Sequence, residues 1–234
     1  MNKVTVGAIV VILALFGGLV FWTMNNGKED KYRDYDVATI IDSTEDTGIG
    51  EHVRGKVDSE VILVEYADLQ CPGCASMMPR VTELYEKYGD RVAFVFRNFP
   101  ISGHQNARSA AAAVEAAGFQ GYYWEMLEAT FKARADWMYE TGSDRNDTYV
   151  KIFMETCPDG DVDKFKADMN DERIEKKINF DQSIGREKAK VSATPAFYVN
   201  GKNVPVGDDD TLDDFKNHIE DEIKAQLKKH GIDE

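Results

Sequence analysis

The sequence is poor in cysteine and in proline. Its 234 residues contain three cysteines, too few for a fold held together by several disulfides. Six prolines and the absence of any low-complexity tract argue against extensive disorder. A single Cys-x-x-Cys, with neither a second copy nor a His-x-x-x-His, disfavours a structural zinc site, which needs four ligands. We therefore expect one globular domain with its own core.

Positive charge is also scarce. Lys and Arg number 28 against 42 Asp and Glu, which gives a net charge of −14. A nucleic-acid partner is excluded on this ground, because phosphate contacts need clustered cationic side chains.

The N-terminus contains the one long apolar run. Val4–Met24 has no charged residue, and its length suits a helix across roughly 30 Å of hydrocarbon, with Trp22 at the interface. We predict a signal anchor over residues 1–24. A cleaved signal peptide and a buried core helix are the alternatives. Basic residues flank the run on both sides, so the positive-inside rule does not decide its orientation. Because N-terminal anchors usually act as export signals, we expect a single-pass protein with its domain outside the cytoplasm, at the cell surface or in the periplasm.

The remainder divides into a polar tether and an α/β domain. We predict the tether over residues 25–52 and the domain over residues 53–232, and we expect the protein to be a monomer. The predicted order is a strand at 61–67, a helix at 72–88 that Pro79 should kink, a strand at 91–97, helices over about 104–190, a hairpin at 196–206 and a helix at 211–229. Strand, helix and strand in succession imply a parallel crossover.

Cys71-Pro72-Gly73-Cys74 lies at the first strand-to-helix junction. Cys71 is expected at the N-cap with Pro72 in the first helical position, where the helix dipole and free N–H groups favour a thiolate. Cys74 faces the same side and can attack a mixed disulfide at Cys71. The pattern predicts a redox pair. A structural disulfide and a metal-ligand pair are the alternatives.

Glu65 is a lone carboxyl in the apolar first strand. Burial as an ion would be costly, so its pKa should be raised, which suits a proton acceptor for Cys74. An exposed glutamate on an edge strand is the alternative.

Several segments resemble the DsbA-like branch of the thioredoxin superfamily. They are Glu51–Gly55, Val61–Gln70 with the Cys-Pro-Gly-Cys that follows, Arg97–Pro100, His104 with the Ala-rich segment after it, Phe119–Glu125 and Ala193–Gly201. The resemblance implies a thioredoxin fold, with a central mixed sheet flanked by helices and an inserted helical domain. It also implies disulfide exchange with proteins outside the cytoplasm.

Carried over by residue, the resemblance makes Cys71 the attacking thiol and Cys74 the resolving thiol. It makes Pro195 a cis-proline against the active-site sulfurs, and Thr194 a residue that tunes the site. Glu65 stands where relatives place an acidic residue beneath the active site. The Pro-Gly dipeptide departs from the strong oxidant of the family, which has a histidine there, so the reduction potential stays open.

We predict an enzyme, a protein-disulfide oxidoreductase that oxidises cysteines of exported proteins and is reoxidised by a membrane redox partner. No cofactor is expected beyond the Cys71–Cys74 disulfide. A thioredoxin-like reductase on the same side is one alternative. A Cu(I)- or metal-handling thiol module and a non-catalytic adaptor with a structural disulfide are the others.

Cys157 and Arg97 are expected to have no part in catalysis. Cys157 is predicted as a buried free thiol, with an intermolecular or resolving role as the alternative. Arg97, at the end of the second strand, is expected to be a solvated charge.

Overall fold

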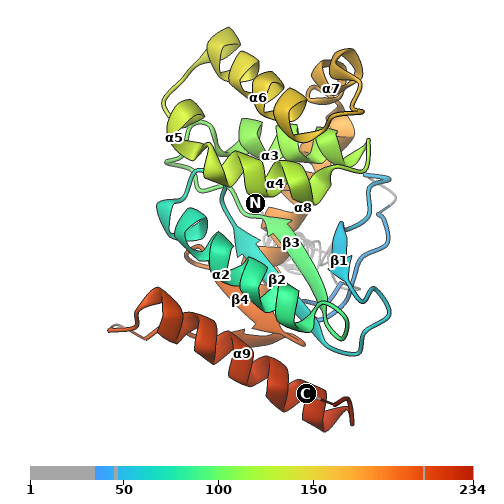
Figure 1. Ribbon diagram of the computed structural model, residues 1–234, viewed down its shortest axis with the longest axis vertical. Helices are drawn as coiled ribbons and strands as arrows, with labels where there is room; N and C mark the ends of the chain where they lie inside the picture. The colour runs from blue at the N-terminus through green and yellow to red at the C-terminus, as the bar shows by residue number, and fades with distance from the viewer. Residues whose placement is uncertain (1–34, 45–46, 208, 234) are drawn as a thin grey trace, which may run out of the picture. The chain divides into compact units, whose positions relative to one another are not determined.

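A five-stranded mixed sheet organises the folded unit, which begins at Asp36 (Figure 1). The computed structural model describes residues 35–44, 47–207 and 209–233. The strands are β1 (Val53–Gly55), β2 (Ile62–Ala67), β3 (Ala93–Asn98), β4 (Ala196–Val199) and β5 (Lys202–Val204), in the order β1-β3-β2-β4-β5. β2 and β3 are parallel and the other pairs antiparallel, which confirms the crossover and the hairpin. β1 has no sequence signal of its own, because three residues cannot establish an alternating pattern.

The helices separate into two that pack beside the strands and a block inserted between β3 and β4. The bounds are α2 (Pro72–Tyr88), α3 (Ala107–Gly118), α4 (Tyr123–Lys132), α5 (Arg134–Trp137), α6 (Gly142–Thr156), α7 (Val162–Asp168), α8 (Glu172–Ile184), the π-helix η1 (Gly185–Ala189) and α9 (Leu212–Lys229). Figure 1 shows α2 and α9 side by side at the sheet, with α6 and α7 at the far end of the insertion from α9. The thioredoxin fold with an inserted helical block is therefore present as predicted.

Helix α2 positions the cysteine pair and is secured through its apolar face. Pro72 occupies the start of the helix, where the missing N–H has no intrahelical acceptor to lose. The helix continues through Pro79 and ends at Gly89. Its buried residues recur at helical spacing and are Cys74, Met77, Met78, Val81, Leu84 and Tyr88. Burial of this face fixes the N-terminus of α2, and with it Cys71.

The inserted helices have aromatic packing of their own. Trp137 and Tyr149 are fully buried with ring centroids 5.6 Å apart, and Phe153 stacks on Phe165 at 4.1 Å. The Trp137 indole N–H donates to the carbonyl of Thr130, which satisfies its polar atom inside this core. The insertion is therefore a packed body with its own core. It contacts the loop that precedes Cys71 and can hold that loop in position.

The lead-in to the domain has no helix or strand over its described residues 36–44 and 47–52, yet it packs against the domain. Val37, Ile41 and Ile49 are buried. The prediction of a solvated Arg97 is wrong, because its fully buried guanidinium pairs with the Glu51 carboxylate and donates to the Tyr66 hydroxyl at 2.8 Å. A buried arginine needs this pairing, and Glu51 supplies it from the lead-in.

The predicted anchor Val4–Met24 lies outside the described residues. Over the ranges that the structure does describe, no helix is both long and apolar enough to span a bilayer.

Candidate active site

Cys71 is the N-cap of α2, as predicted. Its φ of −68° and ψ of 125° are extended, and its carbonyl accepts from the Ala75 N–H at 3.1 Å, which begins the helix. The first N–H groups of the helix have no intrahelical acceptor, so the positive end of the dipole faces the thiol. The Cys71 side chain is 7% exposed, whereas Cys74 is fully buried beneath it. Both sulfurs are free thiols.

The loop before β4 meets this helix start. The Thr194–Pro195 peptide bond is cis, which confirms that prediction. Cys71 Sγ lies 3.6 Å from the Thr194 carbonyl oxygen and donates to it when Cys71 is protonated. A Cβ built on Gly73 would lie 3.5 Å from Pro195 Cδ and 3.7 Å from Cys71 Sγ, both ordinary contacts. The loop therefore lies directly against the cysteine pair.

The two thiols have opposite acidities. A hydrogen bond from the Cys74 thiol is the largest cause that lowers the pKa of Cys71, to about 5, and backbone N–H groups at the helix start add to it. The Thr194 hydroxyl is buried and has no other hydrogen-bond partner among the described residues, so it can donate to the Cys71 thiolate and lower the pKa further. Burial raises the pKa of Cys74 far above its usual value. At neutral pH the pair holds one thiolate, on Cys71, and one thiol, on Cys74.

Glu65 lies on the central strand β2, 4% exposed, between Phe96 of β3 and Phe197 of β4 in register. Burial raises its pKa to about 8, and the nearby Cys71 charge adds to the effect. Its Oε1 is buried without a hydrogen-bond partner among the described residues. The edge-exposed alternative is wrong. Glu65 is a buried, protonated acid at neutral pH, close enough to Cys74 to raise the pKa of that thiol.

Asp68 and Gln70, which precede Cys71, fix the active-site loop. The buried Asp68 carboxylate accepts from the backbone N–H groups of Gln70 and Ile101, both at 2.7 Å, and lies 2.8 Å from His104 Nδ1. The Asp68 carbonyl accepts from the Cys71 N–H at 3.0 Å. These contacts tie the loop after β2 to the loop after β3.

Gln70 connects the same loop to the helical insertion. Its side-chain amide donates to the Met138 carbonyl and accepts from the Asn106 N–H, both at 2.8 Å, and its carbonyl accepts from Arg134 Nε at 2.6 Å. Sequence reasoning missed both Asp68 and Gln70. The only available signal was that two polar residues stand between the predicted buried strand and Cys71, the predicted nucleophile.

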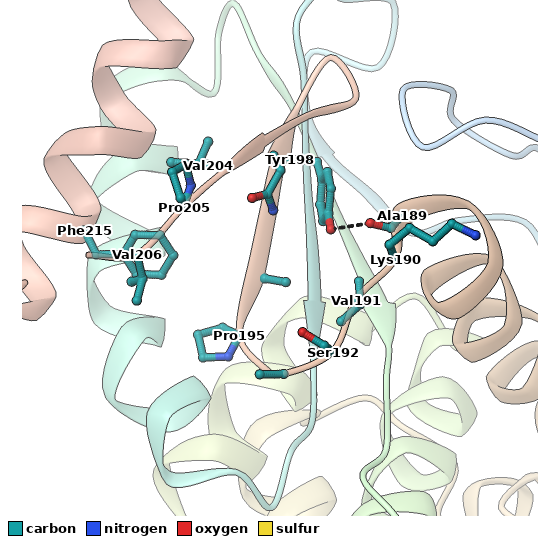
Figure 2. Close-up of a pocket in the computed structure, with 13 residues that line it drawn as sticks. Ala189, Lys190, Val191, Ser192, Pro195, Tyr198, Val204, Pro205, Val206 and Phe215 are labelled. Carbon is teal, nitrogen blue, oxygen red and sulfur yellow. Dashed lines mark hydrogen bonds between the residues drawn. The ribbon is translucent and has the colours of Figure 1, made fainter. Parts of the chain in front are cut away.

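A cavity of about 470 Å³ adjoins the cis-proline. Figure 2 shows Pro195 at one end and the apolar side chains of Val204, Val206 and Phe215 along one side. On the opposite side the Tyr198 hydroxyl donates to the Ala189 carbonyl at 2.7 Å, which holds the end of η1 against the sheet (Figure 2). This hollow is mostly apolar, and Pro195, which lines it, lies against Gly73 of the Cys-Pro-Gly-Cys.

Cys157 is a buried free thiol, as predicted, and burial raises its pKa to about 11. It lies at the end of α6 in the insertion. Within the described ranges, no group of three or more His, Cys, Asp or Glu side chains is placed to hold a metal ion.

Comparisons with known proteins agree with this architecture. A family profile described as thioredoxin matches residues 47–221. The probable disulfide bond formation protein D of Bacillus anthracis is 29% identical over 224 residues, covering 92% of this chain and 93% of that protein. The Na(+)/H(+) antiporter NhaA 1 of Mycolicibacterium vanbaalenii is 32% identical over 154 residues, 64% of this chain. The chain spans only about a quarter of the length of such antiporters, 23% in this case.

Two solved structures share the fold. Oxidised BdbD from Bacillus subtilis has a TM-score of 0.62 at 24% identity, over 76% of this chain and 93% of that one. The alpha-DsbA1 of Wolbachia pipientis has the same TM-score and identity, over 76% of this chain and 94% of that one.

Proposed function

This chain belongs to the thioredoxin family, and from that premise we propose that it is an extracytoplasmic protein thiol–disulfide oxidoreductase that oxidises cysteine pairs of exported proteins. One observation supports this most directly. The pKa of Cys71 is held at about 5 at the helix start, while burial raises that of Cys74. A site that stabilises one thiolate stabilises the reduced form of the pair, and a disulfide whose reduced form is stabilised is an oxidant.

The proposed reaction begins with the oxidised pair. A client thiolate attacks Cys71 Sγ, the Cys71–Cys74 bond breaks, and Cys74 leaves as a thiolate. The second client thiolate attacks the client sulfur of the mixed disulfide, so that the client disulfide forms and Cys71 leaves as a thiolate. Two electrons pass from the client to the enzyme. Of the two protons lost by the client thiols, one is matched by protonation of Cys74 and the other goes to solvent.

In the oxidising direction Glu65 is the proposed proton donor to Cys74, and the acceptor role expected from the sequence is the reverse of this transfer, when Cys74 is deprotonated for reoxidation. Its pKa of about 8 keeps it protonated at neutral pH, and it is buried with an oxygen that bonds to no other described residue. Because Cys74 is also buried and strongly favours its thiol form, a proton from Glu65 removes an otherwise unstable thiolate as the leaving group departs.

The cavity beside Pro195 is the proposed client site. A client segment that lies along the cis-proline loop presents its sulfur to Cys71 and can place an apolar side chain among Val204, Val206 and Phe215. The cysteine pair itself is the only redox group that the proposal requires.

The proposal places the domain, which begins at Asp36, outside the cytoplasm and joined to a signal anchor at residues 1–24, with a membrane protein that reoxidises the pair. The uncharged run Val4–Met24 supports the anchor. The chain resembles a probable disulfide bond formation protein over nearly its whole length, and disulfides form in oxidising compartments outside the cytoplasm, which supports the proposed location.

Trapping of a mixed disulfide tests the proposal. In Cys74→Ser, Cys71 can attack a cysteine peptide supplied as an activated mixed disulfide and release the activating thiol. Because no Cys74 thiol is present to displace the peptide, the peptide–Cys71 disulfide should accumulate. Cys157→Ser is the matched control and should behave as the wild-type protein, because Cys157 lies in the insertion. Failure of Cys71 to form any adduct would overturn the proposal.

The direction of electron flow is tested by equilibrating the full chain, in detergent, against glutathione buffers. A reduction potential of about −120 to −180 mV is expected for a disulfide donor. A potential near about −270 mV would instead identify a reductase of the thioredoxin type.

A further inference from the structure

A second cavity lies at the same edge of the sheet as the cysteine pair. It has a volume of about 360 Å³, and the loop after β3 forms one wall with Ser102, His104 and Gln105. Arg108 of α3 and Arg186 of η1 complete it. Since β2 and β3 are parallel, the loops that follow them meet at one edge, and Cys71 and His104 belong to those two loops. The contact between His104 and Asp68, three residues before Cys71, joins them.

The basic side chains of this cavity differ in whether a carboxylate lies beside them. Arg108 contacts the Glu175 carboxylate and Asn179, and His104 Nδ1 lies 2.8 Å from the Asp68 carboxylate. Arg186 is exposed, and its guanidinium carbon lies 5.8 Å from the centroid of the Phe99 ring. No carboxylate within the described ranges pairs with Arg186. In a chain with a net charge of −14, this concave site keeps one guanidinium uncompensated.

Neutral donors surround that guanidinium. Ser102 and Gln105 are exposed and form no hydrogen bond to the described part of the chain, so a hydroxyl and an amide N–H₂ are available. Gln182 donates to the Pro100 carbonyl and so holds the loop against α8. With Nδ1 of His104 directed to Asp68, the Nε2 atom is the ring nitrogen left for the cavity. A guanidinium fork with nearby neutral donors matches a carboxylate or a phosphate.

We propose that this cavity binds an oxyanion, with Arg186 as its principal contact. The shared chemistry is that of a carboxylate or phosphate group, which can come from free phosphate or from an acidic side chain of a client. Asp68, which contacts His104 of the cavity, is three residues before Cys71, and three residues span at most about 10 Å. An extended client segment covers a similar distance in a few residues, so a client residue four or five positions from the reacting cysteine can reach the cavity. Binding of free phosphate is independent of the redox function, whereas the client source rests on the proposed function.

The first experiment titrates inorganic phosphate into the full chain at constant ionic strength and follows the His104 ring resonances by NMR. We expect a saturable shift in the wild-type protein and at least about tenfold weaker binding in Arg186→Gln. Arg173→Gln is the matched control, because it removes the same charge from an exposed arginine of α8 that pairs with Asp171. No saturable shift, or equal losses in the two variants, would overturn the proposal. An unchanged melting temperature shows that Arg186→Gln remains folded.

The second experiment identifies the source of the anion. Two cysteine peptides that differ by Glu or Gln four residues from the cysteine are oxidised with and without phosphate. A several-fold preference for the Glu peptide that is lost in Arg186→Gln and suppressed by phosphate supports a client carboxylate. Phosphate binding with equal peptide rates supports a free anion. If neither peptide reacts at all, the redox proposal fails while the phosphate titration still decides the site.

Discussion

Replacement of Thr194 by valine separates the electrostatic role of this residue from its place in the fold. The Thr194 hydroxyl is buried with no hydrogen-bond partner among the other described residues, and its hydrogen bond to the Cys71 thiolate is one of the causes that lower the pKa of Cys71. A methyl group of similar shape in its place fills the same space, so the folded state should be retained. The same change removes a hydrogen bond to the Cys71 thiolate, so the pKa of Cys71 should rise.

The magnitude follows from the energy of that bond. A hydrogen bond to a charged group contributes about 1.5–3 kcal/mol, or about one to two pKa units. The pKa of Cys71 would move from about 5 to between about 6 and 7. At pH 7 the reduced pair would lose a corresponding part of its thiolate stabilisation, and the reduction potential would fall by about 30 to 50 mV.

Two measurements check this result: titration of the thiolate by ultraviolet absorbance, and equilibration with glutathione buffers. Thr130→Val is the matched control, because the Thr130 hydroxyl is also buried and unpartnered in the described structure but lies on α4 in the insertion. It should leave both the pKa of Cys71 and the potential unchanged. A Thr194→Val protein that retained both wild-type values would refute the assigned hydrogen bond.

Two further substitutions address the dipeptide and the buried acid. Gly73→His should raise the reduction potential by about 30 mV for each unit by which the imidazolium charge lowers the pKa of Cys71. Gly73→Ala is the control, because a Cβ fits at this position. Equal potentials in the two variants would contradict the prediction. Glu65→Gln should slow the release of Cys74 in single-turnover kinetics, and unchanged kinetics would remove its proposed role. With a pKa of about 8 in the folded protein and 4.5 as its ordinary value, Glu65 costs stability increasingly as pH rises between these values. Chemical unfolding of the reduced protein should therefore show Glu65→Gln more stable by about 3 kcal/mol at pH 7, with the advantage fading toward pH 4.5; a pH-independent difference would count against the raised pKa.

Local chemistry made much of the site predictable. The apolar run before Cys71 indicated a central strand, and Glu65 within it is buried, as the cost of a carboxyl there suggested. Pro72 after Cys71 indicated a helix start, and Cys71 is the N-cap. Thr211 caps α9, where its hydroxyl accepts from the Asp214 N–H in a capping box. These features depend on neighbours within a few residues.

What could not be predicted depends on partners far away in sequence. Gln70 is bonded to Met138, 68 residues later, and Arg97 is neutralised by Glu51, 46 residues earlier. Neither segment has a pattern that identifies its partner, because polar side chains in loops lack the periodicity of a core face. The cis form of the Thr194–Pro195 bond came from the family resemblance, since only about 5–6% of X–Pro bonds are cis.

The buried carboxyl of Glu65 is the strongest internal argument that the site performs proton chemistry. Phe96 and Phe197 are its neighbours in register, and the surrounding strands are apolar, so an aliphatic side chain would suit the packing. An unpartnered buried oxygen destabilises the fold by roughly 1–3 kcal/mol, and a structural role offers nothing to offset it. Glu65 lies close enough to the buried Cys74 thiol to raise its pKa, and in the proposed reaction Cys74 alternates between leaving group and nucleophile, so a group that titrates near neutral pH has a use there. Packing therefore gives no reason for a carboxyl at this position, whereas the resolving step that we propose at Cys74 gives one.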